Sequence, residues 1–308
     1  MDGIDTLENS NSLGTTPSYP PFIPISLYGE LIKIKQTMLL LYTGVLTYLI
    51  LSWPSINVIT LVWLNFSLFF TISGATLFNM YIDRDIDAQM ERTKKRALPS
   101  GQIRPSTVLK HAFIFNGGGF LAAGIFINWM TGLVIFLGLF FDVIVYSIWL
   151  KRRTRYSIIF GGIAGGLPAI AGYTAATGTI NVIAILFGLF VVAWIPLHIL
   201  TLALLPENLE GYKNANIPMW PVTNSKNQTM RVIAISGLIN AIVAIFISIL
   251  LQIHFSTLIL VSIFVSCLVI LSFKNLKQPS DATTFIIFKG ASMIMVTAFF
   301  LWFIGMII

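Results

Sequence analysis

Long apolar segments alternate with short polar ones along the chain from about residue 36 onward. Nine of these segments are close to the roughly 20 residues that a helix needs to cross a bilayer. We expect membrane spans at residues 36–53, 56–80, 108–128, 131–150, 158–177, 180–204, 231–251, 254–273 and 285–307. The alternation of single polar and apolar residues that marks a membrane β-barrel is absent. The pattern therefore predicts an all-α, polytopic membrane protein.

Composition and charge placement agree with this prediction. Hydrophobic residues make up 56% of the 308 positions and charged residues only 10%. The net charge of +7 raises the question of nucleic-acid binding, but the placement of the charge argues against it. With nine spans, all 19 Lys and Arg residues fall on the side that holds the N-terminus. The positive-inside rule then places the N-terminus and the charged loops in the cytoplasm and the C-terminus outside. We expect a prokaryotic plasma membrane.

The first 22 residues differ in composition from the rest of the chain. They are polar, contain prolines and acidic residues, and have no Lys or Arg. Such a segment fits neither a secretory signal peptide nor an Arg-rich transit peptide. We expect residues 1–22 to be a disordered cytoplasmic tail and residues 23–308 to form one transmembrane domain. A short interfacial helix is expected at about 25–35.

A dense group of charged residues follows the second span, in the segment FNMYIDRDIDAQMERTKKRALPSG at 78–101. If the span continues as a helix, Asn79, Asp83 and Asp87 share one face because they are four residues apart. Neighbouring carboxylates repel each other unless a cation lies between them, and oxygen ligands suit Mg²⁺. Asp85 lies on the other face, where we expect it to pair with an Arg or Lys or to cap a turn. The alternative is an ordinary solvated loop with balanced charges.

Basic residues near this segment give a second reason to expect an anionic ligand. Arg92 follows the carboxylates, and the segment LKRRTR after the fourth span supplies Lys151 and Arg152 close to Tyr146. A departing diphosphate needs cationic groups, together with a metal, to stabilise its charge. Membrane topology alone would explain the same basic residues, because positive-inside loops need no ligand. Lys151 and Arg152 are the better candidates of this set.

Four further polar residues lie in or beside apolar segments. Asp142 is the only acid well inside a span, and an intramembrane carboxylate is costly enough to suggest a function. Alternatively, Asp142 is protonated or hydrogen-bonded to Tyr146 one turn away. His198 is either a packing residue or a ligand of a metal or haem. Glu207 and Glu210, in the loop after the sixth span, are candidates for a second acidic site.

These motifs resemble those of the UbiA-like superfamily of intramembrane prenyltransferases. The signature N-x3-D-R-D-x-D-x2-M-x-R-T-x2-R-x-L-x2-G is matched by Asn79, Asp83, Arg84, Asp85, Asp87, Met90, Arg92, Thr93, Arg96, Leu98 and Gly101. A second block is matched by Tyr146, Lys151, Arg152, Thr154, Gly161, Gly162, Ala164, Gly165 and Pro168. A third is matched by Tyr212, Ala215, Ile217, Pro218, Met219, Pro221 and Val222. Within the superfamily, the segments are most similar to the haem-farnesylating branch, the haem O synthases.

The resemblance implies a fold, a reaction and a set of site residues. It implies nine helices around a central, lipid-open cavity, and transfer of a farnesyl group from farnesyl diphosphate to the vinyl group of haem B. Addition of water would then give haem O. The implied Mg²⁺ ligands are Asn79, Asp83 and Asp87. The candidates for binding diphosphate are Arg84, Arg92, Tyr146, Lys151 and Arg152. The candidates for holding the haem acceptor are Asp142, His198, Glu207, Glu210 and Tyr212. A partner in the terminal-oxidase assembly path fits the family, although no docking motif is visible.

The chain departs from the family pattern on the acceptor side. The usual P-P-H-F reads PLHI at 196–199, and the acidic pair before Tyr212 is reduced to Glu210 and Gly211. Two other functions therefore stay open. The first is prenyl transfer to a quinone precursor or a glycerol phosphate lipid, which would use the same metal site. The second is a membrane transporter or lipid-binding protein, although the short outer loops argue against a second opening.

Overall fold

The computed structural model describes residues 23–308, and within that range every regular element is a helix. The elements are α1 (Ile25–Leu31), α2 (Ile34–Ser52), α3 (Val58–Gln89), α4 (Pro105–Phe126), α5 (Trp129–Leu139), the π-helix η1 (Phe140–Leu150), α6 (Ser157–Thr177), α7 (Val182–Ala203), α8 (Pro206–Asn214), α9 (Trp220–Thr223), α10 (Lys226–Leu250), α11 (Phe255–Lys277) and α12 (Asp281–Ile307).

Nine helical segments of the described chain are long and apolar enough to cross a membrane, with α5 and η1 forming one continuous span. Their bounds lie close to the nine predicted spans, so the prediction of an all-α, multi-pass membrane protein is confirmed. The predicted tail at 1–22 lies outside the described residues. The expected interfacial helix is shorter than predicted, because α1 ends at Leu31 and the chain turns at Lys33 before α2 begins.

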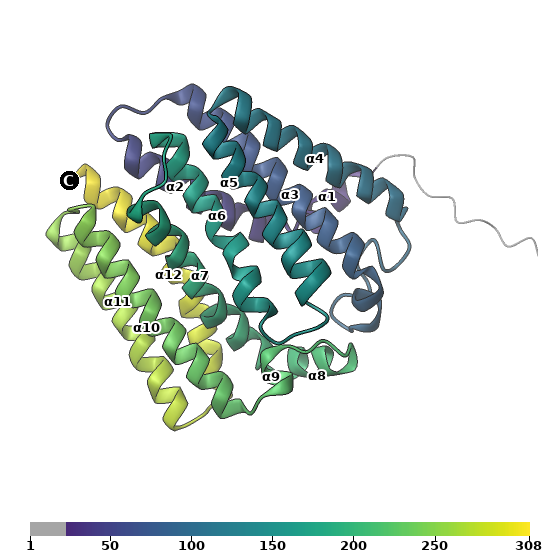
Figure 1. Ribbon diagram of the computed structural model, residues 1–308. Helices are drawn as coiled ribbons and strands as arrows, with labels where there is room; N and C mark the ends of the chain where they lie inside the picture. The colour runs from purple at the N-terminus through teal and green to yellow at the C-terminus, as the bar shows by residue number, and fades with distance from the viewer. Residues whose placement is uncertain (1–22) are drawn as a thin grey trace, which may run out of the picture.

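The spans form two groups of neighbours that meet at α6 and α7 (Figure 1). In one group, α3 packs against α4, α4 against α5, and α5 against α6. In the other, α7 packs against α10 and α12, while α11 packs against α10 and α12. Helix α2 connects the groups, because it contacts α3, α6 and α12. The C-terminus lies at the opposite end of the bundle from α8 and α9 (Figure 1), as an odd number of spans requires.

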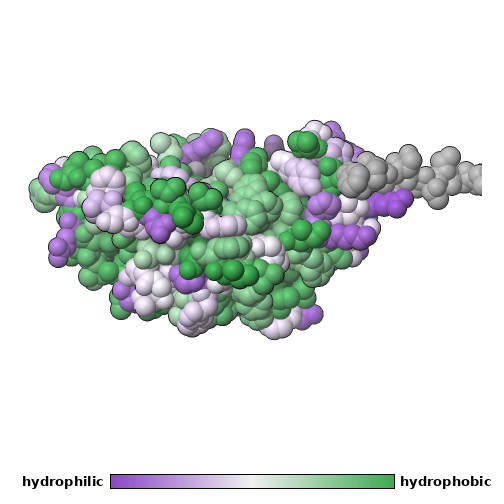
Figure 2. Space-filling view, turned by 90° about the horizontal axis from the view of Figure 1, so that it is seen from above, coloured by the Kyte–Doolittle hydropathy of each residue, from purple (hydrophilic) through white to green (hydrophobic). Residues whose placement is uncertain are grey.

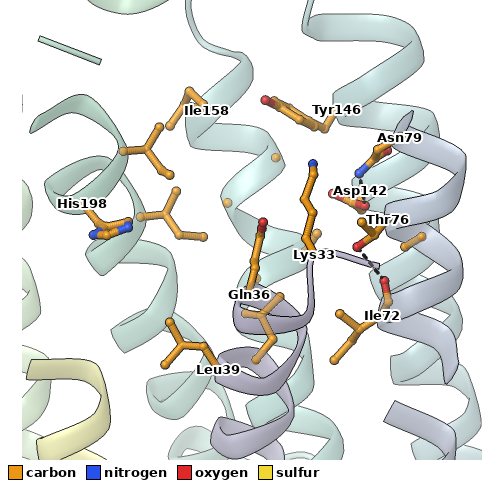
Figure 3. Close-up of a pocket in the computed structure, with 18 of the residues that line it drawn as sticks. Lys33, Gln36, Leu39, Ile72, Thr76, Asn79, Asp142, Tyr146, Ile158 and His198 are labelled. Atoms are coloured by element: carbon orange, nitrogen blue, oxygen red, sulfur yellow. Dashed lines mark hydrogen bonds between the residues drawn. The ribbon is translucent and has the colours of Figure 1, made fainter. Parts of the chain in front are cut away.

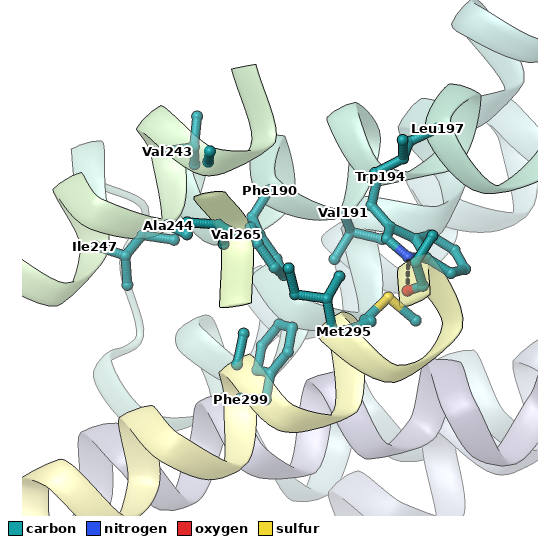
Figure 4. Close-up of a cluster of buried hydrophobic side chains, with 14 of the residues drawn as sticks. Phe190, Val191, Trp194, Leu197, Val243, Ala244, Ile247, Val265, Met295 and Phe299 are labelled. Carbon is teal, nitrogen blue, oxygen red and sulfur yellow. Dashed lines mark hydrogen bonds between the residues drawn. The ribbon is translucent and has the colours of Figure 1, made fainter. Parts of the chain in front are cut away.

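Aromatic side chains hold α7 against α12 in the largest buried cluster (Figure 4). Phe190 packs against Phe299 and Trp302, with ring centroids 5.9 and 5.0 Å apart. Nearer the cavity, the indole Nε1 of Trp194 donates a hydrogen bond to the backbone oxygen of Ala291. Close packing of this kind drives helix association in lipid, where burial of apolar surface between helices gives little net gain.

Glycines allow α6 to lie close to two other helices. A Cβ added at Gly172 would overlap the backbone carbonyl of Gly44 on α2. A Cβ added at Gly166 would be too close to the carbonyl of Gly188 on α7. Small residues at such positions let helix backbones approach closely in membranes. Helix α6 is therefore fixed between α2 and α7, and this arrangement sets the position of the cavity wall.

The outer surface of the bundle is largely apolar. Large side chains such as Phe113, Ile125, Ile270 and Met293 are between 62% and 69% exposed. Hydrophobic residues cover much of the face seen in Figure 2, with hydrophilic residues scattered among them and along its edges. A soluble protein rarely exposes so much contiguous apolar surface, whereas a lipid-facing surface requires it.

Candidate functional site

A cavity of about 800 Å³ lies inside the bundle, within the size range of ligand pockets. Its charged lining residues are Lys33, Lys35, Asp83, Asp87, Arg92, Arg96, Asp142 and Lys151. Its apolar lining includes Leu39, Leu40, Leu68, Ile72, Ile135 and Leu139. Along α3, Leu68 lies roughly 16 Å of helix rise from Asn79. The cavity thus combines a charged end with an apolar interior, which suits a ligand with a charged head and an apolar chain.

Helix α3 presents the predicted oxygen-rich face to the cavity. The apolar span ends at Ile82, but the helix continues to Gln89, so Asn79, Asp83 and Asp87 all line the cavity from one helix. The prediction that these residues share a face is confirmed. Asp83 is 6% exposed and Asp87 9% exposed. The Asp83 Oδ1 atom is buried and has no hydrogen-bond partner. A buried carboxylate oxygen without a partner is costly and indicates a place for a bound cation.

Each of the two carboxylates has its own cationic partner. Lys151 Nζ forms an ion pair with Asp83 Oδ2, and Arg96 Nη1 lies 3.0 Å from Asp87 Oδ2. Burial acts to lower the pKa of Lys151, but the neighbouring Tyr146, followed by the Asp83 and Asp87 carboxylates, outweighs it and raises the pKa. Lys151 is therefore fully protonated at neutral pH and carries a positive charge into the cavity.

The segment between α3 and α4 folds back onto the site. Thr93 Oγ1 donates to the backbone oxygen of Asp87, at 2.9 Å. The backbone N–H of Ala97 donates to Glu30 Oε1 on α1, at 3.0 Å. These bonds fix the segment so that Arg92 and Arg96 line the cavity. From the sequence, Arg92 was named as a diphosphate-binding candidate and Arg96 only as a match to the family signature. Both lie in the same basic segment, and only the folded-back backbone distinguishes their contacts.

The π-helix η1 supplies a second row of polar side chains that faces α3. Asn79 Nδ2 donates to Asp142 Oδ2 at 2.7 Å, and Ser147 Oγ donates to Asn79 Oδ1 at 2.7 Å. Lys151 follows one turn later, where its backbone N–H donates to the oxygen of Tyr146. A π-helix has a wider turn than an α-helix, so residues five apart lie on one side of it. Such segments occur frequently at functional sites. The partner of Asp142 is thus Asn79, and not Tyr146, which was one of the alternatives left open by the sequence.

Two of the predicted diphosphate-binding arginines lie outside the cavity lining. Arg152 binds both carboxylate oxygens of Asp85, at 2.7 and 2.6 Å, and donates to the backbone oxygen of Ile82. The hydrogen bond from Arg152 lowers the pKa of Asp85. The predicted pairing of Asp85 with a basic residue is therefore confirmed. Arg84 is exposed, donates to the backbone oxygen of Tyr81 and lies over its ring. Both arginines thus contact α3 outside the cavity lining.

Lys33 is a cavity residue that sequence reasoning missed. It adopts the left-handed conformation, with φ of 46°, at the break between α1 and α2. This turn directs its side chain into the space between His198 and the Asn79–Asp142 pair (Figure 3). Burial, followed by repulsion from Lys151 and Arg96, lowers its pKa to about 8. The sequence offered only a weak signal, because Lys33 reads as one more positive-inside residue.

The remaining predicted residues divide between the cavity and the surface. His198 lines the cavity, and its ring is stacked between those of Trp194 and Phe288, with centroids 4.5 and 4.7 Å away. Tyr146 and Tyr212 also line the cavity.

Glu207 and Glu210 do not line the cavity. They lie on α8, where both are exposed. Helix α8 runs across the end of the bundle, and of its residues only Tyr212 lines the cavity. The structure therefore does not bring these two residues to the predicted second acidic site.

The α3 donor set fits Mg²⁺. The described residues contain no group of three or more His, Cys, Asp or Glu side chains placed to hold a metal by themselves. Mg²⁺ needs fewer protein ligands, because it is usually bound by one or two carboxylates and completes its shell with water and substrate phosphates. Asp83 and Asp87, with the unpartnered Oδ1 of Asp83, meet that requirement.

Comparison with known proteins agrees with this geometry. The family model described as "UbiA prenyltransferase family" matches residues 39–304, which is most of the chain. The chain belongs to the UbiA prenyltransferase family. Among its curated relatives is the protoheme IX farnesyltransferase of Caldivirga maquilingensis, 33% identical over 275 residues that cover 88% of this chain and 95% of that protein. The protoheme IX farnesyltransferase of Korarchaeum cryptofilum is 39% identical over 209 residues, covering 68% and 69% respectively.

Solved structures share the UbiA fold. A digeranylgeranylglyceryl phosphate synthase structure superposes with a TM-score of 0.76 at 22% identity, covering 92% of this chain and 98% of that one. A UbiA homologue from Archaeoglobus fulgidus, bound to GPP and Mg²⁺, gives a TM-score of 0.67 at 14% identity, covering 89% and 98%. The chain is thus a prenyltransferase of this family by sequence, and its nine-helix arrangement is that of the family.

Proposed function

We propose that this protein transfers a farnesyl group from farnesyl diphosphate to the vinyl group of haem B, with addition of water, giving haem O and diphosphate. The observation that carries the proposal is the charged end of an otherwise apolar cavity, where Asp83 and Asp87 lie among Lys33, Arg92, Arg96 and Lys151. The choice of haem as acceptor rests on the relatives named protoheme IX farnesyltransferase.

Asn79, Asp83 and Asp87 would hold Mg²⁺, which when bound supplies positive charge to the diphosphate oxygens. The protein's own cations act on the same group. Lys151 and Arg96 already touch the two carboxylates, and a metal at Asp83 and Asp87 would leave both side chains available to the diphosphate. Charged hydrogen bonds to the departing diphosphate stabilise the charge that develops as its bond to the allylic carbon breaks.

The apolar part of the cavity has two tasks in this reaction. It accommodates the isoprenoid chain along Leu39, Leu68 and Ile72, which lie on α2 and α3 below the charged end. It also excludes water from the farnesyl cation until the vinyl carbon has attacked, because water would otherwise capture the cation first. The amphipathic substrate explains why the charged end lies where the spans leave the lipid.

The acceptor would lie on the side of the cavity opposite Asn79 and Asp142. His198 lies on this side (Figure 3), and its stacking between Trp194 and Phe288 holds its imidazole in one orientation, while Tyr212 lines the cavity beside Ile86 and Met90 at the end of α3. A rigidly held imidazole suits an axial ligand of haem iron. We assign His198 this role, with haem B as the partner it receives. We place the chain in a plasma membrane with the charged loops in the cytoplasm, following the positive-inside rule.

A turnover assay tests the proposal. Membranes containing the full chain would be supplied with haem B, farnesyl diphosphate and Mg²⁺, and the extracted haems separated by chromatography and identified by mass. Haem O from the parent protein, and not from the Asp83→Asn variant, is the expected result. Diphosphate release with a quinone precursor or a glycerol phosphate lipid, and none with haem B, would instead assign prenyl transfer to another acceptor.

A further inference from the structure

Asp142 is a partly buried acid in the cavity lining that the proposed reaction does not use. It lies in η1, inside a membrane span, where an ionisable group is expensive and usually has a specific partner. That partner is Asn79, whose Nδ2 donates to Asp142 Oδ2 at 2.7 Å, as Figure 3 shows. Asn79 is at the same time one of the three residues on the oxygen-rich face of α3.

The contact decides which way the Asn79 carboxamide points. In this contact the NH₂ group of Asn79 faces Asp142 and donates to its Oδ2, and a carboxylate oxygen accepts such a bond. On the other side, Ser147 Oγ donates to Asn79 Oδ1 at 2.7 Å, and Ser147 is only 1% exposed. Ser147 occupies one of the two lone-pair positions of the amide oxygen, and the second is left for another ligand.

We propose that Asp142 and Ser147 are positioning residues that fix the Asn79 carboxamide so that its carbonyl oxygen is presented to a metal bound beside Asp83. The inference rests on the metal site of the proposed function. The unpartnered Oδ1 of Asp83 marks the place where that metal binds, one helical turn from Asn79. Groups that orient metal ligands in this way commonly contribute about 10- to 100-fold to metal affinity.

Metal binding, measured without turnover, tests the inference. The detergent-solubilised full chain would be dialysed to equilibrium against Mn²⁺ at a fixed concentration of inorganic diphosphate, and bound Mn²⁺ measured by electron paramagnetic resonance after acid release. Asp142→Asn is nearly isosteric but can donate to Asn79, so the amide loses its fixed orientation. We expect its Mn²⁺ affinity to fall about 10- to 100-fold. The matched control is Asp281→Asn, which changes an acid paired with Lys226 away from the cavity and should bind Mn²⁺ like the parent.

A second variant separates orientation from charge. Ser147→Ala removes the other hydrogen bond to the Asn79 carboxamide and changes no charge near the metal. Its Mn²⁺ affinity should also fall, which the loss of the Asp142 charge cannot explain. If Asp142→Asn fails to fold, Ser147→Ala decides the question by itself, since reduced affinity in a folded protein supports the inference and parental affinity overturns it.

The result for Asp83→Asn shows which proposal has failed if the outcome is negative. Unchanged Mn²⁺ binding in Asp83→Asn would show that the metal does not bind at Asp83, and the proposed function as stated would fail with it. Lost binding in Asp83→Asn, together with parental binding in a folded Asp142→Asn, would leave the metal site intact and overturn the role assigned to Asp142.

Discussion

Two adjacent basic residues should differ sharply in their importance for turnover. Lys151 lines the cavity and pairs with Asp83, with side chains 18% and 9% exposed. Arg152 pairs with Asp85 outside the cavity lining, with side chains 39% and 55% exposed. Replacing either residue by Met removes one positive charge from the same short segment. A difference in turnover between the two variants therefore depends on the position of each side chain and not on the total charge of the loop.

The expected magnitudes follow from these environments. Removing a preorganised donor that stabilises developing charge in an enclosed site typically costs about 2.7–4 kcal/mol, or roughly 10²- to 10³-fold in turnover. We expect this loss for Lys151→Met. A half-exposed surface ion pair contributes about 0–1 kcal/mol, so Arg152→Met should lose less than roughly fivefold.

The Lys151→Met variant also has a stability effect that must be separated from catalysis. Without the ammonium, the Asp83 carboxylate is left buried without a countercharge, which costs about 3–5 kcal/mol in comparable pairs. Mg²⁺ bound at Asp83 would replace that charge, so the thermal unfolding midpoint of the variant should rise with added Mg²⁺ more than that of the parent. Rates would be normalised to folded protein, measured by size-exclusion chromatography at the same Mg²⁺ concentration.

Two results would refute this reasoning directly. Equal losses of turnover in Lys151→Met and Arg152→Met would mean that the loop acts through its overall charge. Near-parental turnover in Lys151→Met would show that the diphosphate is bound elsewhere. Haem O formation in membranes, with farnesyl diphosphate and haem B both saturating, is the measurement in each case.

Three further changes have distinct expected outcomes. Lys33 is protonated below its pKa of about 8 and loses its charge above it, so kcat/KM should fall as pH rises through that value. Lys33→Arg should move this decrease in kcat/KM to higher pH. An unchanged pH profile of kcat/KM in the variant would exclude Lys33 from diphosphate binding. Gly172→Val should lower the thermal unfolding midpoint, because the backbone of Gly44 leaves no room for a side chain and overpacking typically costs about 1–3 kcal/mol. An unchanged unfolding midpoint would contradict the close approach of α2 and α6. His198→Ala should raise the KM for haem B without changing that for farnesyl diphosphate, whereas equal increases would indicate a packing role.

The sequence was sufficient for the features that depend on length, polarity and spacing within one helix. Nine apolar segments predict nine spans, because lipid admits few other structures. The four-residue spacing of Asn79, Asp83 and Asp87 predicts a shared face because α3 stays regular across the membrane boundary. Both inferences depend on local geometry that a helix repeats, and this is why the structure agrees with them.

The features that the sequence did not predict depend on contacts between elements or on irregular backbone. The π-helix at Phe140–Leu150 changes which residues of the fourth span face α3, so Asp142 meets Asn79 and not Tyr146. The left-handed turn at Lys33 directs a cation inward that a continuous helix would have left at the interface. Hydropathy and charge do not detect the π-helix or the left-handed turn, because neither feature changes the composition of its segment.

The charges of the cavity are paired in a way that connects its resting structure to the proposed reaction. Asp83 and Asp87 each hold a cation, so neither carboxylate is left without a countercharge before substrate binds. A metal bound to these carboxylates would take over that task and leave Lys151 and Arg96 without their partners, and a diphosphate would offer them new ones. Neither the metal nor the diphosphate alone keeps every buried charge paired, whereas the two together do. The structure thus favours joint binding of metal and diphosphate, and coupling of this kind is reciprocal, because each ligand must raise the affinity for the other by the same factor.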